Sequence, residues 1–248
     1  MLTRLANPAN FLRFARLATP IAGGLALLTF PIAIYLSLIG SPAAEDHGQT
    51  VRILYVHVAS AWSMMACYSA LAIASLVYFV WRHPLADTAA KAIAIPGVVM
   101  TALCLATGSL WGKPAWNTWW QWDGRMTSVL VLLLLYIGYF AVRARASESP
   151  NALRLAAIVA MVGAFNLPII KFSVDWWASL HQPATLSSPG APGLPAPLLA
   201  PLLTMVLAYT AFIAWFVLRE VREDILHRAK SRQKNLPKSS VSVTELPA

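Results

Sequence analysis

The residues best suited to chemistry in this sequence are gathered in one short aromatic stretch. Residues 111–125 read WGKPAWNTWWQWDGR, which places five tryptophans within twelve positions and ends near an aspartate and an arginine. A further pair, Trp176 and Trp177, brings seven of the ten tryptophans into two segments. Indole rings bury a large apolar area and pack against other flat groups. The ordinary membrane belt of tryptophans scatters them over many helix ends, so this clustering predicts a platform for a wide, flat, apolar ligand.

A short amphipathic helix is the predicted geometry of the stretch. If residues 115–123 are helical, four side chains share one face: Trp116, Trp119, Trp120 and Asp123. Pro114 suits the first turn of such a helix and Gly124 suits its end. Thr127 or Ser128 would then cap the helix that follows. The sequence therefore predicts a helix that lies flat on the membrane surface.

Two histidines flank the aromatic stretch, and both could ligate a metal. His57, in ILYVHVASAW, lies about one turn into an apolar segment, where ionisable residues are rare and usually functional. His181, in DWWASLHQP, follows the second tryptophan pair. A single histidine near a helix end is more often simply hydrogen-bonded, but two at one depth beside an aromatic shelf favour paired ligands. Since imidazole is a standard axial ligand of haem iron, the flat ligand is predicted to be haem.

Charged residues near the stretch would complete such a site. A porphyrin carries two anionic propionates, and the nearby cations are Arg125, Lys113, Arg52 and Lys171, of which arginine is better suited to a bidentate contact. Asp123 could pair with Arg125 or orient a histidine through its ring N–H. The residues together predict a site for non-covalent haem b, open to the outer face of a membrane.

The composition predicts that these residues belong to an all-α membrane protein, whose helices hold them in position. Of the 248 residues, 58% are hydrophobic and 12% are charged, against about 25% charged in soluble domains. In lipid the backbone must satisfy its own hydrogen bonds, and the apolar runs are too long for barrel strands. Six transmembrane helices are predicted, at roughly 17–40, 53–80, 92–110, 126–142, 155–170 and 197–218. The fifth is the weakest, because it is short and has Arg154 and Lys171 at its ends.

The basic residues predict the topology of these helices. With the N-terminus in the cytoplasm, the inner segments hold fifteen of the nineteen lysines and arginines, which is the positive-inside pattern. Both termini are then cytoplasmic, and the aromatic stretch lies outside. The net charge of +9 follows from this topology, so nucleic-acid binding is not needed to explain it. We predict a membrane domain over 1–218, with the aromatic segment at 111–128, and a basic cytoplasmic tail over 219–248.

The string WGKPAWNTWWQWDGRMTS resembles the WWD domain of the haem-handling proteins of cytochrome c maturation. Over all six predicted spans the chain is similar to the family of haem exporter protein C, CcmC. The resemblance implies that haem is bound at the periplasmic face of the bacterial inner membrane, with His57 and His181 as the axial ligands. The WWD positions are Trp111, Trp116, Trp119, Trp120, Trp122 and Asp123. It also implies partners: the ABC-type subunits CcmA and CcmB, the small membrane protein CcmD, and the haem chaperone CcmE, which receives the haem.

Two other classes of function remain open from the residues. The permease half of an ABC exporter is expected to need polar groups at the midplane, yet the span interiors hold almost no charged residues. The sequence has no GxxxxGK[ST] phosphate loop, so another chain would supply any ATPase. A haem lyase would need an outer thiol, whereas Cys67 and Cys104 both lie inside apolar runs. A carrier that is not an enzyme is therefore favoured, and the proline-rich segment 182–197 is either a semi-rigid tether or a plain loop.

Overall fold

The structure, a computed structural model, is built from α-helices. It describes residues 6–44, 48–146, 149, 151–177, 179, 181 and 194–234. The elements are α2 (Pro8–Tyr35), η1 (Leu36–Gly40), α3 (Val51–Trp81), α4 (Pro84–Trp116), α5 (Gly124–Ala144), α6 (Ala152–Ala164), α7 (Asn166–Trp176) and α8 (Ala196–Lys234). Within these described ranges there is no β-strand. The predicted all-α fold is confirmed.

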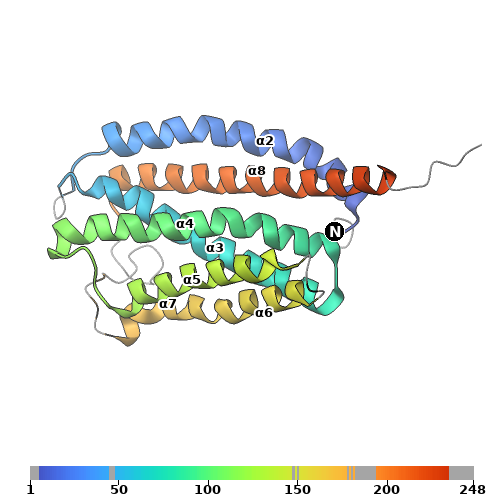
Figure 1. The fold of residues 1–248 in the computed structure, drawn as a ribbon. Coiled ribbons are helices and arrows are strands. Elements are labelled where there is room, and N and C mark those ends of the chain that lie inside the picture. Colours follow the sequence, from blue (N-terminus) through green and yellow to red (C-terminus); the bar gives the residue numbers. More distant parts are fainter. Residues whose placement is uncertain are drawn as a thin grey trace, which may run out of the picture.

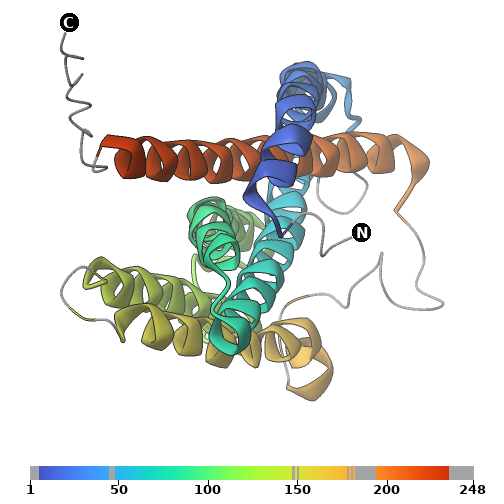
Figure 2. The same ribbon diagram turned by 90° about the vertical axis from the view of Figure 1, so that its right-hand side faces the viewer.

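The helices pack side by side in one bundle (Figure 1). α3 packs against α4, α6 and α8, whereas α2 packs mainly on α8. Seen from the second direction, α8 crosses the bundle obliquely beneath α2 (Figure 2). The start of α3, the end of α4, the start of α5 and the end of α7 meet at the same end of the bundle (Figure 1). We call this the tryptophan end, because it carries residues 111–123.

Among the residues that the structure describes, six helical segments are long and apolar enough to cross a membrane, as predicted. They are Pro8–Gly40, Val51–Trp81, Pro84–Trp116, Gly124–Ala144, Ala152–Trp176 and Ala196–Ser231. Each extends beyond the predicted apolar run, because helical hydrogen bonding continues into the polar flanks. At the start of α2, for example, the side chain of Asn7 caps the helix by accepting the N–H of Ala9 at 2.9 Å. The last helix likewise continues into the predicted basic tail, as far as Lys234.

The fifth span consists of two helices in place of one. α6 ends at Ala164 and α7 begins at Asn166, so the helix is interrupted at Phe165, whose side chain is 79% exposed. Asn166 is buried, and its amide donates to the carbonyl of Ser128 in α5 at 2.7 Å. This side-chain hydrogen bond ties the start of α7 to α5. The two pieces together reach from 152 to 176, which explains why the apolar run 155–170 looked too short to span a membrane.

The predicted helix over residues 115–123 is wrong. α4 instead continues through Pro114 to Trp116, and Asn117 ends it with a left-handed backbone at φ 58°. Asparagine tolerates this conformation better than most residues, and the ammonium of Lys113 donates to its carbonyl and its side-chain oxygen at 3.3 and 3.0 Å. Residues 117–123 are then non-helical. The four side chains expected to share a helix face are therefore held by an irregular segment.

The main hydrophobic core lies largely between α3, α4, α5 and α6, and buried residues of α2, α7 and α8 join it. Its largest side chains include Tyr68 and Tyr136, which are fully buried and meet edge to face with their ring centroids 4.9 Å apart. Each tyrosine hydroxyl points at a glycine in the neighbouring helix, Gly163 for Tyr68 and Gly97 for Tyr136, where a Cβ would collide with it. Small residues that let helices approach closely are typical of membrane bundles. Three of the helices that pack at this centre, α3, α4 and α5, also have one end at the tryptophan end (Figure 1).

A buried ion pair joins α4 to α5 at the opposite end of the bundle. The guanidinium of Arg143 donates to both carboxylate oxygens of Asp87 at 2.7 Å, and the side chains are 12% and 8% exposed. Nearby, the hydroxyl of Thr88 donates to Asp224 in α8 at 2.9 Å. These contacts fix α4 between α5 and α8, and so hold the far end of the helix that leads into the tryptophan segment.

Candidate functional site

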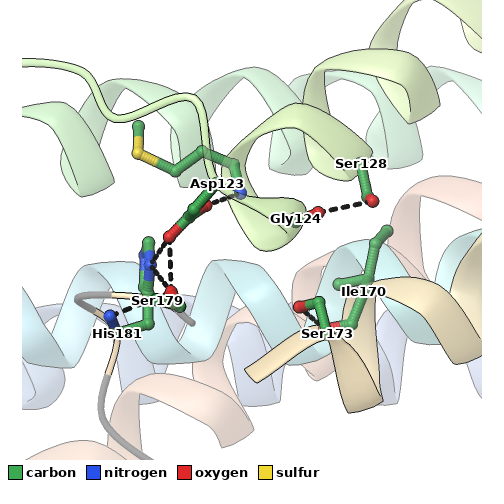
Figure 3. Close-up of polar contacts among 8 residues, drawn as sticks. Asp123, Gly124, Ser128, Ile170, Ser173, Ser179 and His181 are labelled. Atoms are coloured by element: carbon green, nitrogen blue, oxygen red, sulfur yellow. Dashed lines mark hydrogen bonds and ion pairs between the residues drawn. The ribbon is translucent and has the colours of Figure 1, made fainter. Parts of the chain in front are cut away.

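Asp123 is the centre of a hydrogen-bond network at the tryptophan end (Figure 3). Its Oδ1 accepts the backbone N–H of Met126 at 2.8 Å and so caps the first turn of α5. Its Oδ2 accepts the hydroxyl of Ser179 at 2.5 Å and lies 2.6 Å from Nδ1 of His181. The Asp123 and His181 side chains are 2% and 12% exposed. One buried carboxylate therefore joins the start of α5 to the segment that follows α7.

This arrangement corrects one expectation and bears on another. The cap of α5 was expected from Thr127 or Ser128, with Gly124 ending a preceding helix; instead Asp123 is the cap and Gly124 begins α5. Asp123 was expected either to pair with Arg125 or to orient a histidine, and the structure places it in contact with Nδ1 of His181.

The protonation of the pair follows from its surroundings. Burial raises the pKa of Asp123, but the hydrogen bonds from Ser179 and Met126 and the proximity of His181 outweigh burial, so the pKa is lowered. Burial lowers the pKa of His181 and outweighs the opposing attraction of Asp123. We therefore assign a carboxylate and a neutral imidazole at pH 7. Because the carboxylate can only accept, Nδ1 of His181 carries the proton and Nε2 keeps its lone pair.

His57 is held in the same tautomer by a different helix. Its Nδ1 lies 3.1 Å from the carbonyl oxygen of Cys104 and 3.1 Å from the hydroxyl of Thr107, both in α4. A carbonyl can only accept, and the Thr107 hydroxyl already donates to the carbonyl of Leu103 at 2.7 Å. Nδ1 of His57 is therefore the donor, and in the neutral ring Nε2 is unprotonated. Gly108 keeps this position open, because a Cβ there would lie 3.1 Å from Cε1 of the ring.

The two histidines and Arg125 are neighbours in the fold. His57 interacts electrostatically with both His181 and Arg125, and His181 also interacts with Arg125. Arg125, which is half-buried in the first turn of α5, has Asp123 and Asp175 as its acidic neighbours. Residues from α3, α5 and the segment after α7 are thus brought together, although they are widely separated in the sequence.

Comparison with known proteins shows the family of the chain. The model of the family described as "Heme exporter protein C", CcmC, matches residues 1–236. The chain belongs to the CcmC family. It is 45% identical over 224 residues to heme exporter protein C of Bradyrhizobium diazoefficiens, covering 90% of this chain and 85% of the relative. The corresponding protein of Haemophilus influenzae is 35% identical over 227 residues, 92% of each chain.

A mitochondrial relative extends the comparison to plants. The "putative cytochrome c biosynthesis ccmC-like mitochondrial protein" of Marchantia polymorpha is 37% identical over 195 residues, covering 79% of this chain and 82% of the relative. CcmC membership implies haem handling in cytochrome c biogenesis. The six apolar helices are those of a multi-pass membrane protein.

The tryptophans of this CcmC chain fall into two environments. Trp116 is half-buried and meets the ring of His181 edge to face, with the centroids 4.7 Å apart. Trp119 and Trp122 are 56% and 75% exposed. Trp120 lies between these extremes: its ring is 5.4 Å from that of Trp122, and its indole nitrogen is buried with no hydrogen-bond partner among the described residues. The segment therefore presents one ring pair at His181 and another at Trp120 and Trp122, together with the exposed ring of Trp119.

The remaining tryptophans of the site lie in the helices beside this segment or, for Trp177, directly after α7. Trp111 is half-buried near the end of α4. Trp177 packs over Gly124, where an added Cβ would lie 3.0 Å from the indole ring. Trp176 stacks on Phe172 of α7 with the ring centroids 5.8 Å apart, and it is 57% exposed. Of the second tryptophan pair, Trp177 therefore reaches the start of α5, whereas Trp176 remains on α7.

Three residues that support the histidines were missed in the sequence: Ser179, Thr107 and Cys104. A serine two positions before a histidine is a recognisable turn signal, because its hydroxyl can accept the N–H two residues on; Ser179 does so with His181 at 3.1 Å. Thr107 and the carbonyl of Cys104 give no such signal, since their relation to His57 arises from the packing of α3 on α4.

Proposed function

We propose that this CcmC protein binds haem at the tryptophan end and presents it to a partner that removes it. The observation that carries the proposal is that Nδ1 of both His57 and His181 faces a hydrogen-bond acceptor. Each ring has Nδ1 tied to a fixed acceptor, so each has Nε2 free to bind iron. Histidines that ligate metals are typically oriented through the other ring nitrogen in this way.

The other residues have matching roles in this proposal. The porphyrin supplies a flat aromatic plate, and the indole rings of the tryptophan end offer it apolar area. Trp116 would contact the porphyrin beside His181, and the exposed Trp119 and Trp122 would cover its outer part. Arg125, close to both histidines, is the cation placed to pair with a propionate. Haem is therefore held by side chains alone, without a covalent bond.

The proposal includes a location and a set of partners. By its resemblance to the haem-handling proteins of cytochrome c maturation, the chain lies in the bacterial inner membrane with the tryptophan end in the periplasm. CcmE is the proposed acceptor, and CcmA, CcmB and CcmD are the proposed membrane partners. Transfer requires one imidazole to leave the iron while the acceptor offers a ligand of its own.

We further propose that the protein is a carrier and not an enzyme. A covalent thioether between haem and this chain itself would need a reactive cysteine thiol of this chain near the site. Cys67 is buried in the middle of α3. Cys104 is also buried, and its sulfur lies 3.9 Å from Nδ1 of His57, on the side of the ring away from Nε2.

An absorption spectrum of the purified protein, oxidised and then reduced, tests the haem site. Two nitrogen ligands give sharp low-spin bands, and His57→Ala or His181→Ala should each lower the haem retained on purification by at least about tenfold. His227→Ala is the matched control, because His227 is exposed near the far end of α8. Retention of wild-type bands by both site variants would rule out axial ligation by these histidines.

A further inference from the structure

The hydroxyl of Ser179 has an unusual position beside the proposed iron ligand (Figure 3). It donates to Oδ2 of Asp123 at 2.5 Å and accepts the backbone N–H of His181 at 3.1 Å. It also lies 3.3 Å from Nδ1 of His181. The hydroxyl therefore contacts the imidazole, the backbone that carries it, and the carboxylate that orients it.

We propose that Ser179 is a positioning residue that fixes the ring of His181 and limits how strongly Asp123 draws on the Nδ1 proton. This inference rests on the proposed haem-binding function, and it adds a residue to that site.

The first part of the role is geometric. Residues 179 and 181 lie outside any helix, so no helical hydrogen bonds define the backbone there. The acceptance of the His181 N–H by the Ser179 hydroxyl closes a local turn. Because the same hydroxyl is anchored on Asp123, which caps α5, the turn is held against a helix end. Loss of the hydroxyl would free the backbone of the ligand.

The second part of the role is electronic. Two donors, the Ser179 hydroxyl and the His181 ring, share one oxygen of Asp123, while Met126 occupies the other oxygen. A carboxylate oxygen that accepts a second hydrogen bond is a weaker acceptor for the first. Without the hydroxyl, Asp123 would draw more on the Nδ1 proton, and Nε2 would become a stronger electron donor to iron. Hydrogen bonding around the axial ligand is an established means by which a protein changes a haem potential.

The test measures the midpoint potential of bound haem in the full-length protein for Ser179→Ala, Ser179→Thr and Ser179→Cys. We expect the alanine variant to have a more negative potential and lower haem retention, and threonine to restore both. The thiol of the cysteine variant is a weaker donor, so its potential should lie between wild type and alanine. Ser173→Ala is the matched control, because Ser173 is buried beside Gly124 but its hydroxyl bonds to the carbonyl of Ile170.

The outcomes separate this inference from the proposed function. Absence of His181-dependent low-spin bands in the wild type would contradict the function itself. If those bands are present and the alanine or cysteine variant has the wild-type potential, the positioning role of Ser179 is wrong, whatever its haem retention. If the alanine variant keeps too little haem to measure, the cysteine variant decides: a negative shift supports the role, and an unchanged potential overturns it.

Discussion

Asp123→Asn separates two roles of this carboxylate, which caps α5 and contacts Nδ1 of His181, with little change in side-chain volume. An amide has one acceptor oxygen and one NH2 group, whereas Asp123 accepts at both oxygens. If the amide oxygen keeps the cap to Met126, the NH2 group faces two donors, the hydroxyl of Ser179 and Nδ1–H of His181. The ring of His181 must then turn or take the other tautomer, and either change moves the lone pair of Nε2.

The size of the effect follows from the hydrogen bond that is lost. A hydrogen bond to a charged group contributes about 1.5–3 kcal/mol. Changes to residues that orient a metal ligand lower metal affinity about 10- to 100-fold, which corresponds to about 1.4–2.7 kcal/mol. We therefore expect Asp123→Asn to bind haem about 10- to 100-fold more weakly than wild type. Asp123→Ala should lose in addition about 1 kcal/mol of folding stability, because it also removes the cap of α5.

The assay is a hemin titration of the purified protein in detergent, followed by the Soret and low-spin bands, with thermal unfolding measured on the same samples. Asn7→Ala is the control for loss of a cap alone, because Asn7 caps α2 through Ala9 and does not touch the site. It should lower stability and leave hemin affinity unchanged. A folded Asp123→Asn protein that binds hemin as tightly as wild type would refute the reasoning.

Two further substitutions test other parts of the structure. Gly108→Ala would place a Cβ 3.1 Å from Cε1 of His57 and shift the ring by a few tenths of an ångström, so hemin affinity should fall by about tenfold or less; Gly138→Ala, with nothing within 4 Å of the new Cβ, should match wild type in the same titration. Arg143→Ala leaves Asp87 buried without its bidentate partner, and should lower the free energy of unfolding by about 3–5 kcal/mol. Wild-type thermal stability of that variant would contradict the importance of the pair.

The spans were predictable because their signal is local. An apolar run such as 53–80 must form a helix in lipid, and the structure places α3 at Val51–Trp81. The interruption at Phe165 was not predictable in this way. It depends on the amide of Asn166 reaching the carbonyl of Ser128 in another helix, and no local pattern reports such a contact.

The aromatic segment shows a competition between two local signals. The spacing of Trp116, Trp119 and Trp120 suits a helix face. However, Asn117 is a residue type that ends helices, and Asp123 is a residue type that begins them. The backbone preferences of these two residues determined the outcome. That Asp123 would meet a histidine was predictable from residue type. That it would be His181 and not His57 depends on tertiary packing.

The interruption at Phe165 has a consequence for the release of cargo. His57 lies in α3, which packs on three other helices, and its ring is bonded to α4. His181 follows α7, a short helix that packs mainly on α5 and is separated from α6 at a non-helical residue. If haem is bound as proposed, a displacement of α7 would move the His181 imidazole away from the iron once the contact between His181 and Asp123 at the start of α5 is broken. If the two histidines ligate iron as proposed, the bond to His181, which lies outside any helix, would be the easier to break, and a receiving protein would gain access to the iron from that side.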